Sequence, residues 1–379
     1  MPERLKVAVL FGGRSGEHEV SLASARSVMG ALDAEHFEVI PVGITREGAW
    51  LVGADPMTAL ESEEFDGTKP VAILPDPTRK GLNALQRQEE NEGAQLALLS
   101  RVDVVFPVLH GTFGEDGTVQ GLLELANVPY VGAGVLASAV AMDKVLFKQV
   151  CSAAGLPIPD YTFCTRRRWE REPEIVLDEV ERRLDYPVFT KPANLGSSVG
   201  ITKCHDRQEL GQGLDEAARY DRRLLIEAAV PHAREIEVSV LGNEAPMASV
   251  PGEIVPSREF YDYAAKYLDD GQEASELLIP AALDEETTER IREMALRAYK
   301  VIDGAGMARV DFLVNGETSE VLLNEINTIP GFTKISMYPK LWEASGMPYR
   351  RLLSWLVDLA LERHAENARS ERLFRPGEA

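Results

Sequence analysis

The stretch ARVDFLV at residues 308–314, followed by LNEIN at residues 323–327, decides how the fold and chemistry of this chain are interpreted. In both segments apolar and polar side chains alternate, and this pattern predicts two β-strands with one apolar and one polar face. Asn315-Gly316, at the end of the first segment, is a turn signal. The sequence therefore predicts a β-hairpin.

Polar side chains of the two predicted strands could form one site. If odd positions pair with odd positions, Asp311, Glu325 and Asn327 converge on one surface beside Arg309, whereas a slip of one residue would separate the two sets. Two carboxylates and an amide oxygen suit Mg²⁺ and do not suit zinc. The arginine could stabilise a developing oxyanion. A solvated hairpin face with incidental charges would show the same spacing.

Two loops could add backbone donors to such a site. The turn NTIPGF at residues 327–332 brings backbone amides back toward the polar hairpin face, as in an oxyanion hole. The segment KPANLGSSVG at residues 191–200 combines a lysine with small residues, which let N–H groups approach phosphate oxygens closely. It is neither a Walker A loop nor a nucleophile elbow, and an ordinary turn rich in hydroxyls is the alternative.

The segment GAGVLA at residues 132–137 matches the G-x-G-x-x-A fingerprint of dinucleotide-binding proteins. It lacks the acidic residue that should end a following strand about 20 residues further on. We interpret it as a tight turn, and an NAD-dependent dehydrogenase is the alternative that it leaves open.

Composition limits the classes of protein that fit. The chain has 379 residues, of which 45% are hydrophobic and 27% charged, as in globular proteins with two or three domains. Its net charge of −21 would repel a nucleic acid. We find no apolar run long enough for a membrane span and no signal peptide at the start, so a cytoplasmic location and no membrane partner are expected. The three cysteines lack metal or redox spacing.

The order of predicted elements indicates an α/β (α+β) chain. A strand, glycine loop, helix and strand at residues 5–45 predict a βαβ beginning. Residues 53–100 predict a short strand and a helix, with no chemistry assigned. We expect domains at 1–140, 141–235 and 236–365, the last closed by an amphipathic helix, and a tail at 366–379 that frays from about residue 364.

Seven motifs in this order resemble the D-alanine–D-alanine ligase family of the ATP-grasp fold. They span nearly the whole chain, and their sequences are FGGRSGEHEVSLAS (11–24), HGTFGEDGTVQG (110–121), MDK (142–144), KPANLGSSVG (191–200), REIEVSVLG (234–242), YDYAAKY (261–267) and ARVDFLV with LNEINTIPGFTKISMYP. The resemblance implies a three-domain ATP-grasp fold with an N-terminal Rossmann-like domain.

The resemblance also implies which residues contact each ligand. ATP would be bound by Lys144, Lys191, Ser198, Glu227, Ala229, Val230, Glu235 and Lys266. Two Mg²⁺ ions, with Mn²⁺ as an alternative, would be held by Asp311, Glu325 and Asn327. The two D-alanines and the oxyanion would be contacted by Glu17, His110, Arg309, Gly331, Ser336 and Met337. Ser197 and Tyr267 would join Glu17 in a hydrogen-bonded triad that closes the loop 257–275.

The implied reaction forms D-alanyl-D-alanine for peptidoglycan through a D-alanyl phosphate, in a homodimer. Relatives that make D-alanyl-D-lactate lack the AKY signature that ends at Tyr267, so its presence favours the dipeptide. A D-alanine–D-lactate ligase and a non-catalytic ATP-binding protein are the remaining alternatives. Leu195 departs from the glutamate of some members, and 53–100 is longer than in compact members.

Overall fold

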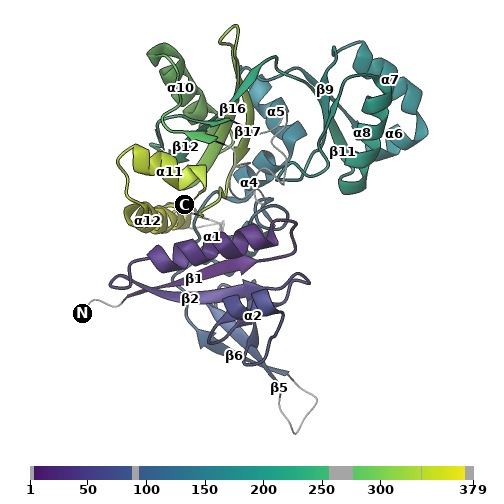
Figure 1. Cartoon of the computed structure of the whole chain (residues 1–379). Coiled ribbons are helices and arrows are strands. Elements are labelled where there is room, and N and C mark those ends of the chain that lie inside the picture. Colours follow the sequence, from purple (N-terminus) through teal and green to yellow (C-terminus); the bar gives the residue numbers. More distant parts are fainter. Residues whose placement is uncertain (1–3, 88–93, 256–275, 334, 372–379) are drawn as a thin grey trace, which may run out of the picture.

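The computed structural model describes residues 4–87, 94–255, 276–333 and 335–371. These residues form three sheets that follow one another along the chain (Figure 1). The predictions for Lys266, Tyr267 and the whole loop 257–275 lie outside the described residues. No described helix has both the length and the apolar character needed to cross a bilayer.

The N-terminal sheet has seven strands in the order β6-β5-β4-β3-β2-β1-β7. Its elements are β1 (Leu5–Gly12), α1 (His18–Ala31), β2 (Phe37–Ile44), β3 (Trp50–Val52), α2 (Pro56–Ser62), β4 (Lys69–Ile73), β5 (Leu82–Arg87), β6 (Ala94–Ser100), β7 (Val104–Val108) and α3 (Thr118–Ala126). β1 pairs in parallel with β2 and β7, and the predicted βαβ beginning is therefore confirmed.

The region 53–100 differs from the prediction of one short strand and one helix. α2 and β4 account for those two elements, but β5 and β6 add an antiparallel hairpin at the edge of the sheet. Leu82 and Ala84 of β5 are buried, whereas Leu96 and Leu98 of β6 are exposed. The hairpin was missed because an edge strand needs no regular apolar face, and its pairing with β4 cannot be read from local alternation.

The central sheet has four antiparallel strands in the order β10-β9-β11-β8. Its elements are β8 (Tyr161–Thr165), α6 (Arg166–Arg171), α7 (Pro173–Glu181), β9 (Val188–Pro192), β10 (Thr202–Cys204), α8 (Arg207–Tyr220) and β11 (Arg223–Ala228). α6, α7 and α8 share a core with one face of the sheet. Residues of opposite parity, such as Lys191 and Glu227, therefore lie on the other face.

The C-terminal sheet follows the order β15-β14-β12-β16-β17, with β13 paired to β12. Its strands and the helices around it are α4 (Val135–Met142), α5 (Lys144–Ala153), β12 (Ala233–Leu241), β13 (Met247–Ala248), β14 (Gly252–Val255), β15 (Glu276–Leu278), α10 (Glu285–Val301), β16 (Met307–Asn315) and β17 (Val321–Asn327). α4, α5 and α10 share the core on one face of this sheet. The polar hairpin face is directed away from that core.

The predicted hairpin is formed by β16 and β17, and its odd positions pair as expected. Arg309 lies opposite Asn327 and Asp311 lies opposite Glu325. The register then shifts, so that Phe312 pairs with Leu323. Because of this bulge, the β17 residues that face the core change from even to odd numbers (Ile326, then Leu323 and Val321), whereas those of β16 stay even, a shift that alternation alone does not predict.

The last two helices are α11 (Met337–Ala344) and α12 (Tyr349–Ala368). The apolar face of α12 shares one core with residues of β1, α1 and β7, and in Figure 1 it lies between the C-terminal sheet and α1. The C-terminal helix thus completes the N-terminal domain rather than only its own. It continues through Ala368, so residues 365–368 belong to the helix and not to the predicted frayed tail, and residues 372–379 of that tail lie outside the described residues.

Candidate functional site

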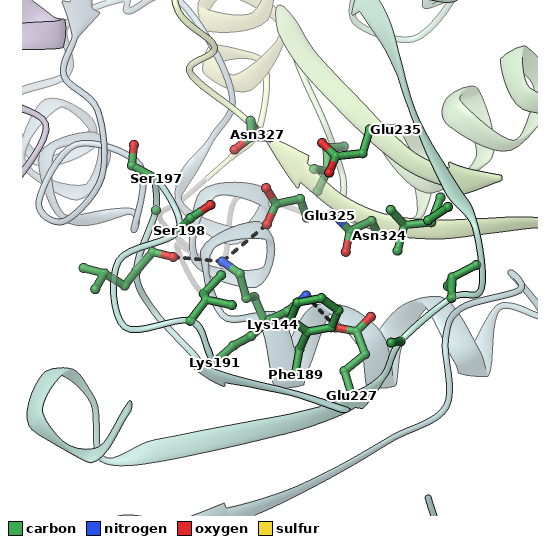
Figure 2. Close-up of a pocket in the computed structure, with 18 of the residues that line it drawn as sticks. Lys144, Phe189, Lys191, Ser197, Ser198, Glu227, Glu235, Asn324, Glu325 and Asn327 are labelled. Atoms are coloured by element: carbon green, nitrogen blue, oxygen red, sulfur yellow. Dashed lines mark hydrogen bonds and ion pairs between the residues drawn. The ribbon is translucent and has the colours of Figure 1, made fainter. Parts of the chain in front are cut away.

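A cavity of about 360 Å³ lies between the central and C-terminal sheets (Figure 2). Predicted site residues that line it are Lys144, Lys191, Ser197, Ser198, Glu227, Ala229, Val230, Glu235, Glu325 and Asn327. They come from α5, β9, the glycine-serine loop at residues 193–200, β11 and β12 with the segment between them, and β17. Residues far apart in the sequence therefore share one partly open cavity with many polar side chains.

Lys144 projects into the cavity from the start of α5. The preceding residue, Asp143, caps this helix by accepting a hydrogen bond from the Leu146 amide at 3.0 Å. The Lys144 ammonium donates to the Leu195 carbonyl at 2.9 Å and lies 3.4 Å from the Glu325 carboxylate (Figure 2). Lys144 therefore lies between the glycine-serine loop and the β16–β17 hairpin, which we call the acidic hairpin.

The glycine-serine loop has an unusual backbone. Ser197 and Ser198 have φ angles of 51° and 58°, a region that costs free energy for residues other than glycine. The Gly200 φ of 73° continues this curved path. Such strained conformations persist only where surrounding contacts stabilise them. This backbone path places Ser197 and Ser198 at the cavity.

Lys191, at the end of β9, donates to Glu227 at 2.8 Å. Glu227 is only 1% exposed, and its second oxygen accepts from Lys148 at 2.9 Å. Burial raises the pKa of the Glu227 carboxyl, but Lys148 and Lys191 outweigh it, so the net pKa is lowered and the group is ionised. A buried carboxylate thus lies between two lysines.

The acidic hairpin contains a tight ion pair. Arg309 donates twice to Asp311, at 2.7 and 2.6 Å, and lies 3.1 Å from Glu237. Asn327 donates to the same Asp311 carboxylate at 3.0 Å. Burial lowers the pKa of Arg309, but Asp311 and Glu237 overcome that effect and raise it well above its usual value. The guanidinium is therefore permanently charged.

The oxygens of Asp311, Glu325 and Asn327 are hard donors on adjoining strands, the type that Mg²⁺ prefers. Among the described residues no group of three or more His, Cys, Asp or Glu side chains forms a preassembled metal site. Two carboxylates with one amide still fit magnesium, because this ion commonly takes its other ligands from phosphates and water. The set does not fit a thiolate- or imidazole-bound metal.

The Glu17 side chain, from the N-terminal domain, contacts the glycine-serine loop. It precedes α1, and its carboxylate accepts a hydrogen bond from the Ser197 hydroxyl. A Cβ atom on Gly111 or Gly196 would lie 2.6 or 2.7 Å from Glu17 Oε2. The two glycines are therefore needed to let this carboxylate sit between two backbone segments.

His110 links the N-terminal domain to the turn after β17. Its Nδ1–H donates to the Ile329 carbonyl at 3.0 Å, and its Nε2 lies 3.1 Å from Ser24 Oγ. The Ser24 hydroxyl also accepts from the Phe332 amide at 3.2 Å. Burial lowers the pKa of His110, so the neutral ring bonds as an Nδ1–H tautomer.

Gly331 and Ser336 lie together in the loop before α11. A Cβ atom on Gly331 would lie 2.7 Å from Ser336 Oγ, and that oxygen accepts from the Thr333 amide at 3.1 Å. Met337, in contrast, packs in an apolar cluster with Ile254 and Leu341. It is thus buried against the sheet and is not among the residues that line the cavity.

The sequence interpretation assigned no role to Glu115, although this residue lies inside a quoted motif. Its carboxylate accepts from the Gly111 amide at 2.9 Å and the Ile329 amide at 3.1 Å. Burial and then the nearby Glu17 raise the pKa of Glu115 to about 8. It joins the glycine-rich turn after β7 to the turn after β17, at one wall of the cavity.

Glu115 should make stability depend on pH. Because its pKa is raised on folding, the stability it contributes is fully present below its ordinary pKa and is lost as pH rises toward about 8. We expect Glu115→Gln to flatten the fall in unfolding free energy between pH 5 and 8, by at most about 1.4 kcal/mol per pH unit. Urea unfolding at several pH values measures this slope, and the exposed Glu343→Gln should keep the wild-type slope.

The cavity also contains residues that sequence reasoning missed, among them Phe189, Lys203 and Asn324. Phe189 and Lys191 share a strand face, and Lys203 pairs with Phe189 across β9 and β10. Period-two alternation around Lys191 could have identified both neighbours. Asn324 reaches the cavity at the bulge of β17, where no sequence signal was present.

Comparisons with protein families match most of the chain. Residues 6–133 match the model described as the D-ala D-ala ligase N-terminus, and residues 150–358 match the D-ala D-ala ligase C-terminus. Together these two ranges contain every described residue of the cavity except Ala141, Met142 and Lys144.

Individual relatives match over nearly their full length. The chain is 54% identical over 371 residues to the D-alanine–D-alanine ligase of Heliobacterium modesticaldum, with 97% of this chain and 98% of that protein covered. The solved D-alanine–D-alanine ligase of Coxiella burnetii has a TM-score of 0.80 and 38% identity, covering 97% and 96% of the two chains. VanG D-Ala:D-Ser ligase of Enterococcus faecalis has a TM-score of 0.82 and 35% identity, covering 94% and 100%.

Proposed function

We propose, from the premise that this chain belongs to the D-alanine–D-alanine ligase family, that its cavity binds ATP and the adjoining cluster binds both D-alanines. The family has the ATP-grasp fold, and the chain is an ATP-dependent ligase that makes D-alanyl-D-alanine for the cell wall. The NAD-dependent dehydrogenase alternative is thereby excluded. The observation that carries the residue assignment is the pairing of Asp311 with Glu325 beside a cavity lined by Lys144 and Lys191.

In this proposal the nucleotide lies between the central and C-terminal sheets. Lys144 and Lys191 bind its phosphates, and Ser198 with the strained loop adds donors. Glu227, Ala229 and Val230 border the adenine, and Glu235 binds the ribose. Lys266, outside the described residues, would reach the γ-phosphate.

Two Mg²⁺ ions, or Mn²⁺, would be held by Asp311, Glu325 and Asn327. When bound, the metal supplies charge neutralisation for the triphosphate. Arg309 lies beside these donors and faces the oxyanion of the reacting carboxyl group, with the Gly331 amide as the second donor. Support for this assignment comes from the shared face of the acidic side chains and from the fixed charge of the guanidinium.

The reaction proceeds in two steps. The carboxylate of the first D-alanine attacks the γ-phosphorus of ATP, which forms D-alanyl phosphate and releases ADP. The amine of the second D-alanine, after losing a proton, attacks the carbonyl carbon, and phosphate leaves. No enzyme nucleophile takes part, so positioning and charge stabilisation carry the rate enhancement.

The first D-alanine would be positioned by the cluster around Glu17. The Glu17 carboxylate would hold its ammonium, and His110 would lie beside that subsite. Ser197 bonds Glu17, and Tyr267 would complete the triad. Ser336 and Met337 would contact the second D-alanine, although the Met337 side chain packs in the apolar cluster with Ile254, which favours an indirect role for it.

We also propose that the protein works as a homodimer in the cytoplasm, where ATP is available, without nucleic-acid or membrane partners. Sedimentation of the full chain would test the dimer: a single species at twice the chain mass supports it, and a monomer at micromolar concentration contradicts it.

The direct test of the proposed function is phosphate release from ATP on addition of D-alanine. We expect release that requires both D-alanine and Mg²⁺, with D-alanyl-D-alanine as the product. A product assay with D-lactate and D-serine present separates related activities. D-alanyl-D-lactate as the main product at neutral pH would support the D-alanine–D-lactate ligase alternative and contradict our assignment. ATP binding without D-alanine-dependent release would support the non-catalytic alternative.

Gly196→Ala should weaken binding of the first D-alanine. The new Cβ would meet the Glu17 carboxylate, a flexible side-chain end that can move away without disturbing the fold. We expect the KM for D-alanine to rise about tenfold, because small displacements of a positioning group have large effects. Steady-state kinetics would measure it, with Gly211→Ala in α8, where a Cβ has room, as the matched control. An unchanged KM would contradict the placement of Glu17.

A further inference from the structure

Lys148 lies behind the wall of the cavity, and the proposed reaction does not use it. It is on α5, one helical turn after Lys144, and only 1% of it is exposed. Its ammonium donates to Glu227 at 2.9 Å, and it is not among the residues that line the cavity. Lys148 therefore cannot touch a bound nucleotide.

The net charge around Glu227 is the sum of three groups in contact. Lys148 and Lys191 each carry +1 and the Glu227 carboxylate carries −1, and the two lysines bond different oxygens of that carboxylate. Without Lys148, Glu227 would cancel the charge of Lys191. With Lys148, one net positive charge remains at Lys191, whose side chain reaches the cavity (Figure 2).

We propose that Lys148 is a positioning residue that neutralises Glu227 so that Lys191 keeps its positive charge for the phosphates of the nucleotide. This inference rests on the proposed function only in assuming that phosphates occupy the cavity beside Lys191. Lys148 would then affect the affinity for the nucleotide electrostatically, through the Glu227 carboxylate.

The burial of Lys148 is costly, and this cost calls for an explanation. Burial lowers the pKa of its ammonium, and Glu227 opposes this effect only in part, so the net pKa is lowered; the 2.9 Å contact with the Glu227 carboxylate is the geometry of a charged pair. A buried ion pair is commonly no more stable than apolar side chains of similar volume. Packing alone would be satisfied by a leucine or methionine on α5, so the charge itself indicates a function.

The test compares two ligands that differ only in phosphates. Lys148→Met keeps the apolar stem and removes the charge. We expect its dissociation constant for ATP, measured by calorimetry with Mg²⁺ and without D-alanine, to rise about tenfold or more. Its affinity for adenosine should stay within about twofold of wild type. A purely structural role would weaken ATP and adenosine equally, and that result would overturn the proposal.

A second variant tests the charge arithmetic directly. Lys148→Met combined with Glu227→Gln removes one positive and one negative charge, so Lys191 again has one net positive charge. Because Glu227 also borders the adenine, the readout is ATP affinity relative to adenosine affinity in the same variant, and we expect this ratio to return to within about threefold of the wild-type ratio. A ratio as low as in Lys148→Met alone would overturn the proposal. Glu235 and Glu325, which also favour the charged form of Lys191, are present in every variant and do not affect the comparison.

Two controls separate the effect on Lys191 from other changes. Arg168→Met breaks the Arg168–Glu179 ion pair of the same central domain, outside the cavity, and should leave both affinities unchanged. Lys148→Arg retains the charge and should bind ATP more tightly than Lys148→Met. An Lys148→Arg variant as weak as Lys148→Met would count against an electrostatic role.

The two proposals fail in different ways. If the wild-type chain binds ATP but releases no phosphate with D-alanine, the assigned reaction fails and the role of Lys148 in nucleotide binding is unaffected. If the wild-type chain is active and Lys148→Met binds ATP as tightly as wild type, the inference about Lys148 fails alone.

Discussion

Arg309→Ala should lower D-alanine-dependent phosphate release about a hundredfold to a thousandfold, the usual cost of losing an oxyanion donor. The guanidinium is a permanent cation that donates two hydrogen bonds to Asp311 and lies 3.1 Å from Glu237. Its loss therefore removes a cationic partner from both carboxylates. The effect should fall mainly on kcat, because the developing charge is present in the transition state and not in bound substrate.

Loss of Arg309 also affects the fold, and the experiment must separate the two effects. Circular dichroism and thermal melting establish whether the variant remains folded. Arg309→Lys keeps one positive charge without the planar pair of donors, so we expect activity between that of wild type and Arg309→Ala. Wild-type turnover in a folded Arg309→Ala protein would contradict the assignment of the oxyanion site.

Glu325→Gln should lower kcat about a hundredfold or more and shift the Mg²⁺ dependence to higher concentration. The substitution keeps the size of the side chain and removes one of the two paired carboxylates of the hairpin, the one that lines the cavity. A neutral amide is a weaker ligand than a carboxylate for a hard cation. The substitution also removes the ion pair between Glu325 and Lys144, whose charged atoms lie 3.4 Å apart. Phosphate release measured across a magnesium titration would show both changes.

The exposed Glu320→Gln, next to the turn of the same hairpin, is the matched control. It removes the same charge from the same hairpin, and we expect wild-type kinetics. Equal loss in both variants would mean that overall charge, rather than a ligand at position 325, determines activity. An unchanged magnesium dependence in Glu325→Gln would contradict the proposed metal site.

Local patterns were sufficient to predict the hairpin that carries this chemistry. Alternation placed Asp311 and Glu325 on the same face, because strand geometry fixes which side chains share a surface. The amphipathic helix that was expected to close the last domain is α12, and it was predicted correctly because its apolar face depends only on residue spacing along one helix.

Features that depend on tertiary packing were not predictable in this way. The bulge that brings Asn324 to the cavity arises from a register shift between two strands. The position of Glu115 depends on two amides, Gly111 and Ile329, from segments far apart in the chain. The sequence gives no signal that distinguishes Lys148 from other helix residues, because its ion pair forms only when β11 places Glu227 against α5. Such contacts require knowledge of which elements pack together.

The shared core of α12 with β1, α1 and β7 has a consequence for protein synthesis. The first βαβ unit is translated about 300 residues before the helix at Tyr349–Ala368 that shares its core. During that interval, Val7, Val9 and Phe11 lack the α12 partners that help to bury them in the folded protein. The nascent chain therefore exposes an aggregation-prone surface until α12 is made, unless a chaperone or transient collapse covers it.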